Sequence, residues 1–175
     1  MARYEFVKGL PVITMAEGKK IGKIDDLIVD PERKAVSWLR LHSGGMLGGE
    51  RLWVSTEAVH GVGADAVTIN AEADARAPAD APEALALVKA KRGIIGSKVM
   101  TENGERVGEV CDYEFDPDTF ALTSLSIPPG MGLAGDTLMI AGDKVLTIGK
   151  DMIVVAADAT MRPEVMAAVG NALAL

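Results

Sequence analysis

The sequence predicts an all-β protein with two tandem small antiparallel β-barrels, each followed by a short C-terminal α-helix. Two observations lead to this fold class: an internal repeat, and short apolar segments separated by turn residues. The segment Gly18–Asp26 returns as Gly104–Asp112, and Asp30-Pro31 returns as Asp116-Pro117, in both cases 86 residues further along the chain. Short strands at this spacing, with no long helix between them, favour a small barrel in each copy.

Each expected strand of the first copy is bounded by a recognisable turn. Gly18 supplies the first turn, and Gly22 marks a bulge in the strand that follows. Asp30-Pro31-Glu32 forms the next turn, because proline fixes the backbone angle that a turn requires. A glycine-rich loop over 43–49 precedes the fourth strand. The expected strands cover residues 11–15, 21–29, 35–41, 51–55 and 66–69.

An Ala-rich tail follows each copy and is expected to contain one helix. Residues 70–81 form a linker, and Pro82-Glu83 begins a helix that reaches residue 91. Pro163-Glu164 begins the second helix, since proline and an acidic residue suit the first helical turn. The expected apolar faces are Leu85 and Val88 in the first helix, and Val165, Val169 and Leu173 in the second. The expected domains are therefore 6–91 and 92–175, each a barrel with its helix.

Composition is that of an ordinary globular protein. Apolar residues make up 49% and charged residues 25% of the 175 residues, and no apolar run approaches the roughly 20 residues that cross a bilayer. Residues 1–8 lack the apolar core of a secretory signal. Cys111 is the single cysteine, which fits a reducing compartment, and the formal charge of −7 disfavours nucleic-acid binding. We therefore expect a cytoplasmic protein with no membrane span.

Alternating carboxylates in the second copy are the candidate for cation binding. They are Asp112, Glu114, Asp116 and Asp118. This spacing begins a calcium loop, but such a loop requires glycine at its sixth position and glutamate at its twelfth. Pro117 and Thr123 occupy those positions, so an EF-hand is excluded. The row is interpreted as a solvated acidic face, with a weak site for a divalent cation or a basic partner left open.

With these residues in view, both halves resemble the PRC-barrel family. That family includes the cytoplasmic domain of the photosynthetic reaction-centre H subunit and the C-terminal domain of a ribosome-maturation factor. In the first copy the resemblance rests on Gly18–Asp26, Asp30-Pro31, Leu47–Leu52 and Val59–Val67. In the second copy it rests on Gly104–Asp112, Asp116-Pro117, Leu133–Gly135 and Val145–Ile153. The resemblance implies a docking module and brings no catalytic residue, cofactor or metal site with it.

Three functions follow as hypotheses. The first is a non-enzymatic adaptor or scaffold module that binds another protein. The second is an accessory protein of a photosynthetic or other membrane electron-transfer complex. The third is a ligand-binding or metal-binding protein, or an enzyme, with a site between the barrels. The sequence offers no convergent set of polar residues for that third hypothesis, and it leaves the identity of the partner and a homodimer open.

The glycine-rich loops are expected recognition segments, since loops on a rigid scaffold commonly carry binding residues. Methionine adapts to varied partner surfaces, whereas the leucines either contact a partner or plug a barrel end. The candidate partner-binding residues in these loops are Met46, Leu47, Met131 and Leu133.

Trp38 and Trp53 are the other candidates for partner binding. The apolar positions that both copies share define the inward face of their strands, so alternation turns both tryptophans outward. Their counterparts in the second copy are Ser124 and Met139. Three possibilities are left open for what packs over the tryptophans: the chain's own helix through Leu85 and Val88, a second barrel or subunit, or an external partner.

The shared apolar positions also predict the core. They are Ile21/Val107, Ile24/Val110, Val29/Phe115, Leu39/Leu125, Leu41/Ile127, Leu52/Leu138, Val54/Ile140, Val67/Ile153 and Ile69/Val155. Two copies of one surface can match each other as in a homodimer. We therefore expect the barrels to form a fixed pseudo-twofold pair, with the helix over 82–91 lying on the first barrel.

Overall fold

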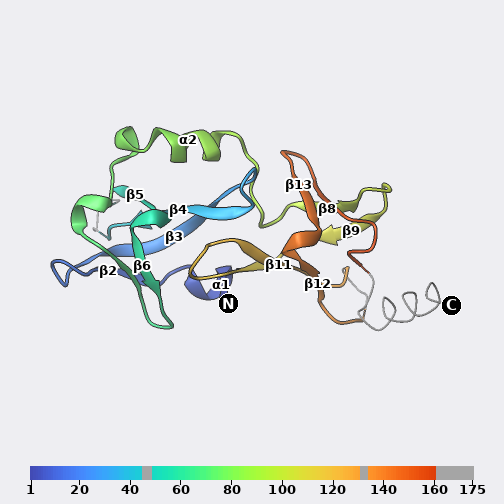
Figure 1. The fold of residues 1–175 in the computed structure, drawn as a ribbon, viewed down its shortest axis with the longest axis horizontal. Coiled ribbons are helices and arrows are strands. Elements are labelled where there is room, and N and C mark those ends of the chain that lie inside the picture. Colours follow the sequence, from blue (N-terminus) through green and yellow to red (C-terminus); the bar gives the residue numbers. More distant parts are fainter. Residues whose placement is uncertain (45–48, 131–133, 161–175) are drawn as a thin grey trace.

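Short strands make up most of the computed structural model, which describes residues 1–44, 49–130 and 134–160 (Figure 1). The chain begins with a two-residue strand, β1 (Ala2–Arg3), and a one-turn helix, α1 (Tyr4–Val7). Two β modules follow, and helix α2 (Pro82–Lys89) runs along the first of them (Figure 1). The expected all-β class is confirmed. No helix in the described part of the chain is long and apolar enough to span a membrane.

The first module is a six-stranded sheet with the order β5-β4-β3-β2-β7-β6. Its strands are β2 (Pro11–Thr14), β3 (Lys20–Asp30), β4 (Ala35–His42), β5 (Arg51–Ser55), β6 (Val59–Val62) and β7 (Val67–Ile69). Neighbouring strands are antiparallel except for β2 and β7, which run parallel. The Asp30 carboxylate accepts the backbone N–H groups of Glu32 and Arg33, which explains the sharp turn between β3 and β4. Short 3-10 turns follow at η1 (Thr56–Ala58), η2 (Glu72–Asp74) and η3 (Pro78–Asp80).

The second module repeats this order, but the counterpart of β3 is divided into two strands. Its strands are β8 (Lys98–Thr101), β9 (Arg106–Glu109), β10 (Asp112–Phe115), β11 (Leu122–Ile127), β12 (Leu138–Ala141), β13 (Val145–Ile148) and β14 (Ile153–Val155), with a 3-10 turn η4 (Gly142–Lys144). Val110 and Cys111 separate β9 from β10. The module therefore has two four-stranded sheets, β13-β14-β8-β9 and β1-β10-β11-β12. The N-terminal strand β1 thus belongs to the sheet of the second module.

The closed barrels expected from the sequence are wrong, because β5 and β6 remain the two ends of an open sheet. The outer edge of β5 is taken by the linker, where Trp53 and Arg76 exchange two backbone hydrogen bonds of 2.8 Å. That edge is therefore not free to pair with β6. In the second module the break after β9 divides the strands between two sheets. The expected C-terminal helix, with Val165, Val169 and Leu173, lies outside the described residues.

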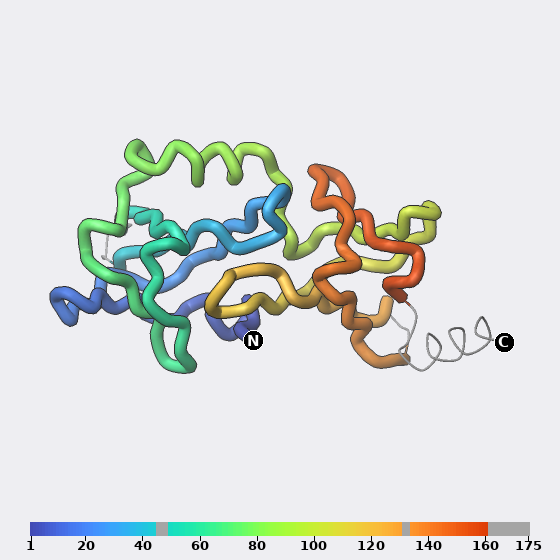
Figure 2. Tube along the Cα trace, in the orientation of Figure 1, coloured from blue at the N-terminus to red at the C-terminus, as the bar shows by residue number. Residues whose placement is uncertain are grey.

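The two modules pair through the turns that lead into β4 and β11 (Figure 2). Ala35 forms an antiparallel bridge with Ala121, which is its own counterpart in the repeat. Two backbone hydrogen bonds of 2.9 Å flank this bridge, from Val36 N–H to Phe120 O and from Leu122 N–H to Lys34 O. Exchanging the two copies converts one bond into the other, so the modules are related by a pseudo-twofold axis. The modules are thus paired about this axis, as the repeat predicts.

One apolar core continues through both modules. It contains every core position predicted from the repeat, although Leu52, Val107 and Leu138 are half-buried at its margin. Aromatic rings of the second module belong to this core at the junction, where the centroids of Phe115 and Phe120 lie 5.9 Å apart. Because burial of this apolar surface is shared, neither module has a complete core of its own.

Candidate functional site

Both tryptophans predicted as partner contacts lie under the chain's own helix. Trp38 is 8% and Trp53 is 3% exposed. They belong to a second apolar cluster with Ile28, Ala81 and Ala84, against which Leu85 and Leu87 pack. The tryptophans are thus covered by the chain's own helix, which leaves little of their surface for a partner. Val88 was expected to share in this cover, but it is 38% exposed and lines a different site.

The other four predicted partner contacts fall outside the described residues. They are Met46, Leu47, Met131 and Leu133. Their role in recognition stays a prediction. The strands that flank them, β4 and β5 in the first module and β11 and β12 in the second, are in place to present both loops.

The acidic row of the second module does not form one solvated face. Asp112 is buried and accepts the backbone N–H of Glu5 at 3.1 Å, while Arg3 pairs with both Asp112 and Glu114. Asp116 instead caps its own turn, as Asp30 does in the first module. These backbone bonds lower the pKa of Asp116. The described ranges contain no group of three or more His, Cys, Asp or Glu side chains that could hold a metal ion.

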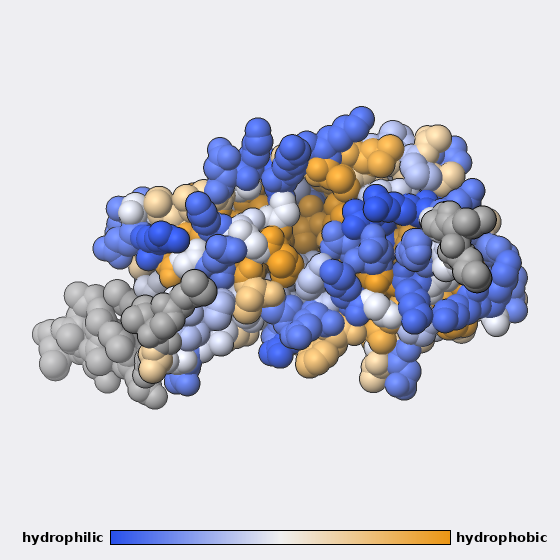
Figure 3. Space-filling model, turned by 180° about the vertical axis from the view of Figure 1, so that it is seen from behind, coloured by the Kyte–Doolittle hydropathy of each residue, from blue (hydrophilic) through white to orange (hydrophobic). Residues whose placement is uncertain are grey.

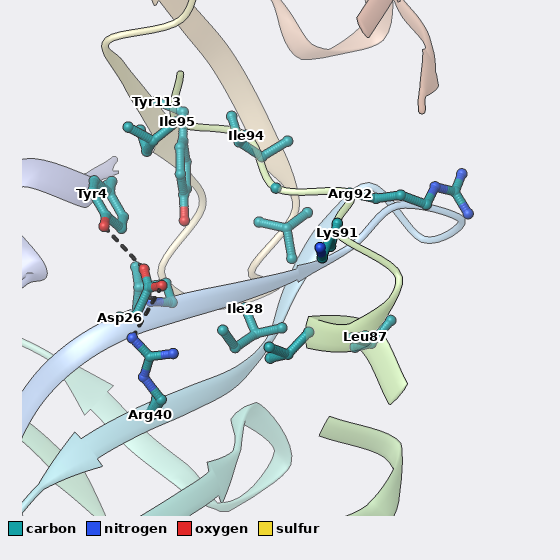
Figure 4. Close-up of a pocket in the computed structure, with 14 residues that line it drawn as sticks. Tyr4, Asp26, Ile28, Arg40, Leu87, Lys91, Arg92, Ile94, Ile95 and Tyr113 are labelled. Atoms are coloured by element: carbon teal, nitrogen blue, oxygen red, sulfur yellow. Dashed lines mark hydrogen bonds and ion pairs between the residues drawn. The ribbon is translucent and has the colours of Figure 1, made fainter. Parts of the chain in front are cut away.

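A pocket of about 270 Å³ lies between the two modules, and the sequence did not reveal it. β3 and β4 form its floor, the segment after α2 forms one side, and α1 and β10 close the other (Figure 4). Its apolar walls are Ile28, Leu87, Val88, Ile94 and Ile95. Apolar surface gathers near the middle of the rear face of the molecule, below the end of α2 (Figure 3).

The polar groups on the floor of this pocket pair with one another. The Tyr4 hydroxyl donates to Asp26 Oδ1 at 2.9 Å, and Arg40 Nη2 lies 3.6 Å from Asp26 Oδ2. Arg40 Nε also donates to Asp25 at 2.7 Å. Burial, the Asp26 charge and the hydrogen bond from Tyr4 to Asp26 raise the pKa of Tyr4 well above its usual value. The one carboxylate on the floor, Asp26, is therefore already engaged by Tyr4 and Arg40, which suits a neutral polar ligand group.

Tyr113 is the one side chain of the pocket with a buried polar atom that lacks a partner. It is 1% exposed, its ring lies 5.0 Å from that of Tyr4, and its hydroxyl points toward β3 in Figure 4. No described group hydrogen-bonds to that hydroxyl. Burial, followed by the Asp26 charge, raises the pKa of Tyr113, so the hydroxyl keeps its proton. A buried hydroxyl without a hydrogen-bond partner costs free energy, so the Tyr113 hydroxyl is a candidate to bond with a group outside the described residues.

Two cations lie at the mouth of the pocket. Arg92 donates to Ile148 O at 2.7 Å and to Glu32 Oε1 at 2.8 Å, so it links the second module to the first. Lys91 has a left-handed backbone, with φ of 53°, and makes no ion pair with the described residues. The chain therefore turns sharply at Lys91 and holds both cations beside the opening.

A second candidate surface surrounds α1. Phe6 is 68% and Met1 is 76% exposed, and the two lie beside the same groove. Phe6 borders a groove of about 740 Å³ that also includes Leu10 and Val62 of the first module and Pro117 of the second. The Arg3 guanidinium lies 5.5 Å from the Phe6 ring centroid and holds it in place.

The sequence reasoning missed Tyr4, Phe6 and Tyr113. The expected first domain began at residue 6, so the strand that crosses to the other module was left out. The available signal for Tyr113 was that its counterpart in the first copy of the repeat is the apolar residue Leu27. A hydroxyl at a position that is apolar in the other copy either finds a polar partner or marks a site.

The geometry defines a class of protein: two β modules related by a pseudo-twofold axis, with a pocket and a groove at their junction. The family model for the PRC-barrel domain matches residues 1–76 and 89–162. The chain belongs to the PRC-barrel family, in two tandem copies. A search of curated proteins found no match.

Proposed function

We propose that this protein is a non-enzymatic adaptor or scaffold module that binds another protein. The observation that carries the proposal is the exposed apolar surface on α1, with Phe6 as its anchor. Aromatic side chains are enriched at binding hot spots, and a contiguous apolar groove on a protein surface commonly marks an interaction site. The PRC-barrel domain is a generic interaction module, which agrees with this use.

The occupant of this groove is a different protein rather than a second copy of the chain. In a homodimer of single modules, the repeated turns would pair between subunits. Here Ala35 and Ala121 make that pairing within one chain, so the self-matching surface is already used. We propose a cytoplasmic setting, because Cys111 has no second cysteine with which to form an internal disulfide.

Two alternative functions remain proposals. An accessory role in a photosynthetic or other membrane electron-transfer complex is supported by the family relationship alone. A ligand site between the modules is supported by the unpartnered Tyr113 hydroxyl. A metal at that position has less support, since Asp26 is already engaged by Tyr4 and Arg40.

The adaptor proposal is tested by affinity capture from native lysate with three forms of the protein. They are the unchanged chain, Phe6→Ser, and Met15→Ser as a matched control. Met15 is 53% exposed in the turn between β2 and β3. Both substitutions replace an exposed apolar side chain, so neither should lower the melting temperature.

We expect a protein that the unchanged chain and Met15→Ser both enrich and that Phe6→Ser loses. Light scattering should give the mass of a monomer for all three forms. Partners retained equally by Phe6→Ser would contradict this site. A dimer of the unchanged chain that dissociates on Phe6→Ser would show that the groove binds a second copy of the chain instead of a different protein.

A further inference from the structure

The pseudo-twofold symmetry is broken at one sheet edge. In the second module, β10 pairs with β11 on one side and with β1 on the other, where Ala2 faces Phe115 and Arg3 faces Glu114. The counterparts of Phe115 and Glu114 in the first module are Val29 and Ile28. There β3 pairs with β4 on one side, but β2 reaches only as far as Lys23 on the other.

The inter-module pocket lies at this open edge. Leu27, Ile28 and Val29 line it, and Figure 4 shows the edge of β3 opposite β4 facing into it. Within the described ranges, no strand pairs with β3 here. The repeat would place residues 88–90 in this position, but they are drawn into the end of α2 and its cap. The helix that covers the tryptophans therefore leaves this edge of β3 without a neighbouring strand.

We propose that the open edge of β3 is a docking slot for an extended peptide segment of a partner protein. The segment adds to β3 at Ile28 and Val29 as β1 adds to β10. Strand addition satisfies main-chain groups at an open sheet edge and is an established mode of peptide recognition. The chain itself shows that an equivalent edge accepts an extended segment.

The Tyr113 hydroxyl supports this occupant over a charged small molecule. It is buried, protonated and unpartnered, so it can donate to a main-chain carbonyl. The neighbouring Asp26 carboxylate is already engaged by the Tyr4 hydroxyl and Arg40. A peptide main chain, which is neutral and offers donors and acceptors alternately, matches that environment.

The walls define the side chains of the segment. In the occupied slot, Arg3 pairs with Asp112 and Glu114. In the open slot Ile28 replaces Glu114, Asp26 is already engaged, and Lys91 lies at the mouth. A basic residue is therefore disfavoured. Apolar side chains fit against the pocket walls at Leu87, Ile94 and Ile95. The expected segment is extended, apolar and free of Lys and Arg.

This slot is distinct from the Phe6 surface and is tested separately. The probe is a capped synthetic peptide with the sequence of residues 1–7 and leucine in place of Arg3. That sequence already fits the equivalent slot, and the change removes the charge that Ile28 cannot pair. Binding is followed by amide chemical shifts of the labelled full-length protein during titration with the peptide.

We expect shifts centred on Leu27, Ile28 and Val29, and binding several-fold weaker for the peptide that retains Arg3. N-methylation of the peptide at its second and third residues keeps every side chain, but it removes the N–H donors of the strand and places methyl groups against the edge of β3, so it should abolish binding. Tyr113→Phe should weaken binding roughly fivefold, the worth of one hydrogen bond. Ile95→Arg should block the mouth, whereas Leu146→Arg, at a similarly exposed position on β13, should not.

Phe6→Ser serves as the control that separates the two sites, and it should leave peptide binding unchanged. Absence of shifts at β3 would overturn the slot. Equal binding of the N-methylated peptide would also overturn it, because the pocket would then recognise side chains or a small molecule rather than a strand. Neither result bears on the Phe6 surface.

Discussion

At the scale of single residues, the two tyrosines explain how the junction is held and where it is unfinished. Tyr4 crosses from α1 to Asp26 of the first module, and its ring packs at a tilt against that of Tyr113 of the second. Its hydroxyl is satisfied, whereas that of Tyr113 is not. The chain has two tyrosines in all, so their ionisation reports on this junction without interference.

Neither tyrosine should ionise near pH 10 while the protein is folded. Burial and the Asp26 charge raise both pKa values, whereas tyrosines in the unfolded chain ionise near pH 10. A raised folded pKa contributes stability that is present below about pH 10 and is lost as pH rises further. Absorbance of tyrosinate should therefore appear together with the loss of circular dichroism. A tyrosinate signal with an ordinary midpoint in a folded protein would contradict the burial.

Residue-level prediction succeeded where the two copies could be compared. Trp38 and Trp53 were placed outward because apolar residues alternate with them at positions shared by both copies. The partner of each charged residue was not predictable in the same way. Arg3 pairs with Asp112 more than 100 residues away, and such a contact depends on how the modules dock.

At the scale of elements, the long strand β3 depends on glycine at a point of close approach. A Cβ on Gly22 would lie 2.8 Å from the carbonyl oxygen of His42 on β4. The counterpart Gly108 has φ of 153°, and a Cβ there would lie 2.6 Å from Ile127 Cγ2. Each glycine lies beside a bulge in the pairing of its strand with the preceding strand, β2 with β3 for Gly22 and β8 with β9 for Gly108. The sequence indicated the bulge, but not the neighbouring chain that requires it.

Gly22→Ala should lower the free energy of unfolding by roughly 1–3 kcal/mol, because the added methyl group meets backbone rather than a flexible side chain. Gly93→Ala is the matched control, since nothing lies within 4 Å of the position of its Cβ. Urea denaturation of both variants checks the difference. Equal stability of the two would show that β3 and β4 can separate here at little cost.

Helix α2 should be held to the sheet mainly by the two tryptophans. The double change Trp38→Ser and Trp53→Met gives the first copy the residues of the second. It should lower stability by about 3 kcal/mol or more, since large buried aromatic surface is lost. The mass in solution should stay that of a monomer by light scattering. An unchanged melting temperature would show that α2 is anchored elsewhere.

Most elements of the first module were predictable because apolar segments and turn residues alternate clearly. Sheet closure was not, since it depended on whether the edge of β5 paired with β6 or with the linker at Arg76. The division of β9 from β10 was also hidden. The Val110 N–H bonds to Ser97 O beside β8, whereas the Cys111 N–H bonds to Ser126 O on β11. Both are apolar residues like those of an ordinary strand, so their sequence does not mark the break.

At the scale of the whole molecule, two copies of one module behave as a dimer within one chain. The bridge between Ala35 and Ala121, the continuous core and the crossing of β1 all join the halves. Symmetry made this pairing predictable from the repeat. The departures from symmetry, β1 on one edge and α2 on one face, were not predictable, and these departures create both proposed binding surfaces.

The rotational diffusion of the two halves tests this central claim most directly. Amide nitrogen relaxation should give residues 1–91 and the described part of 92–175 one common correlation time, that of a rigid particle of 18.3 kDa. A continuous core and a shared sheet leave no hinge between them. Two distinct and shorter correlation times, one for each half, would contradict the fused pair and remove the slot between the modules.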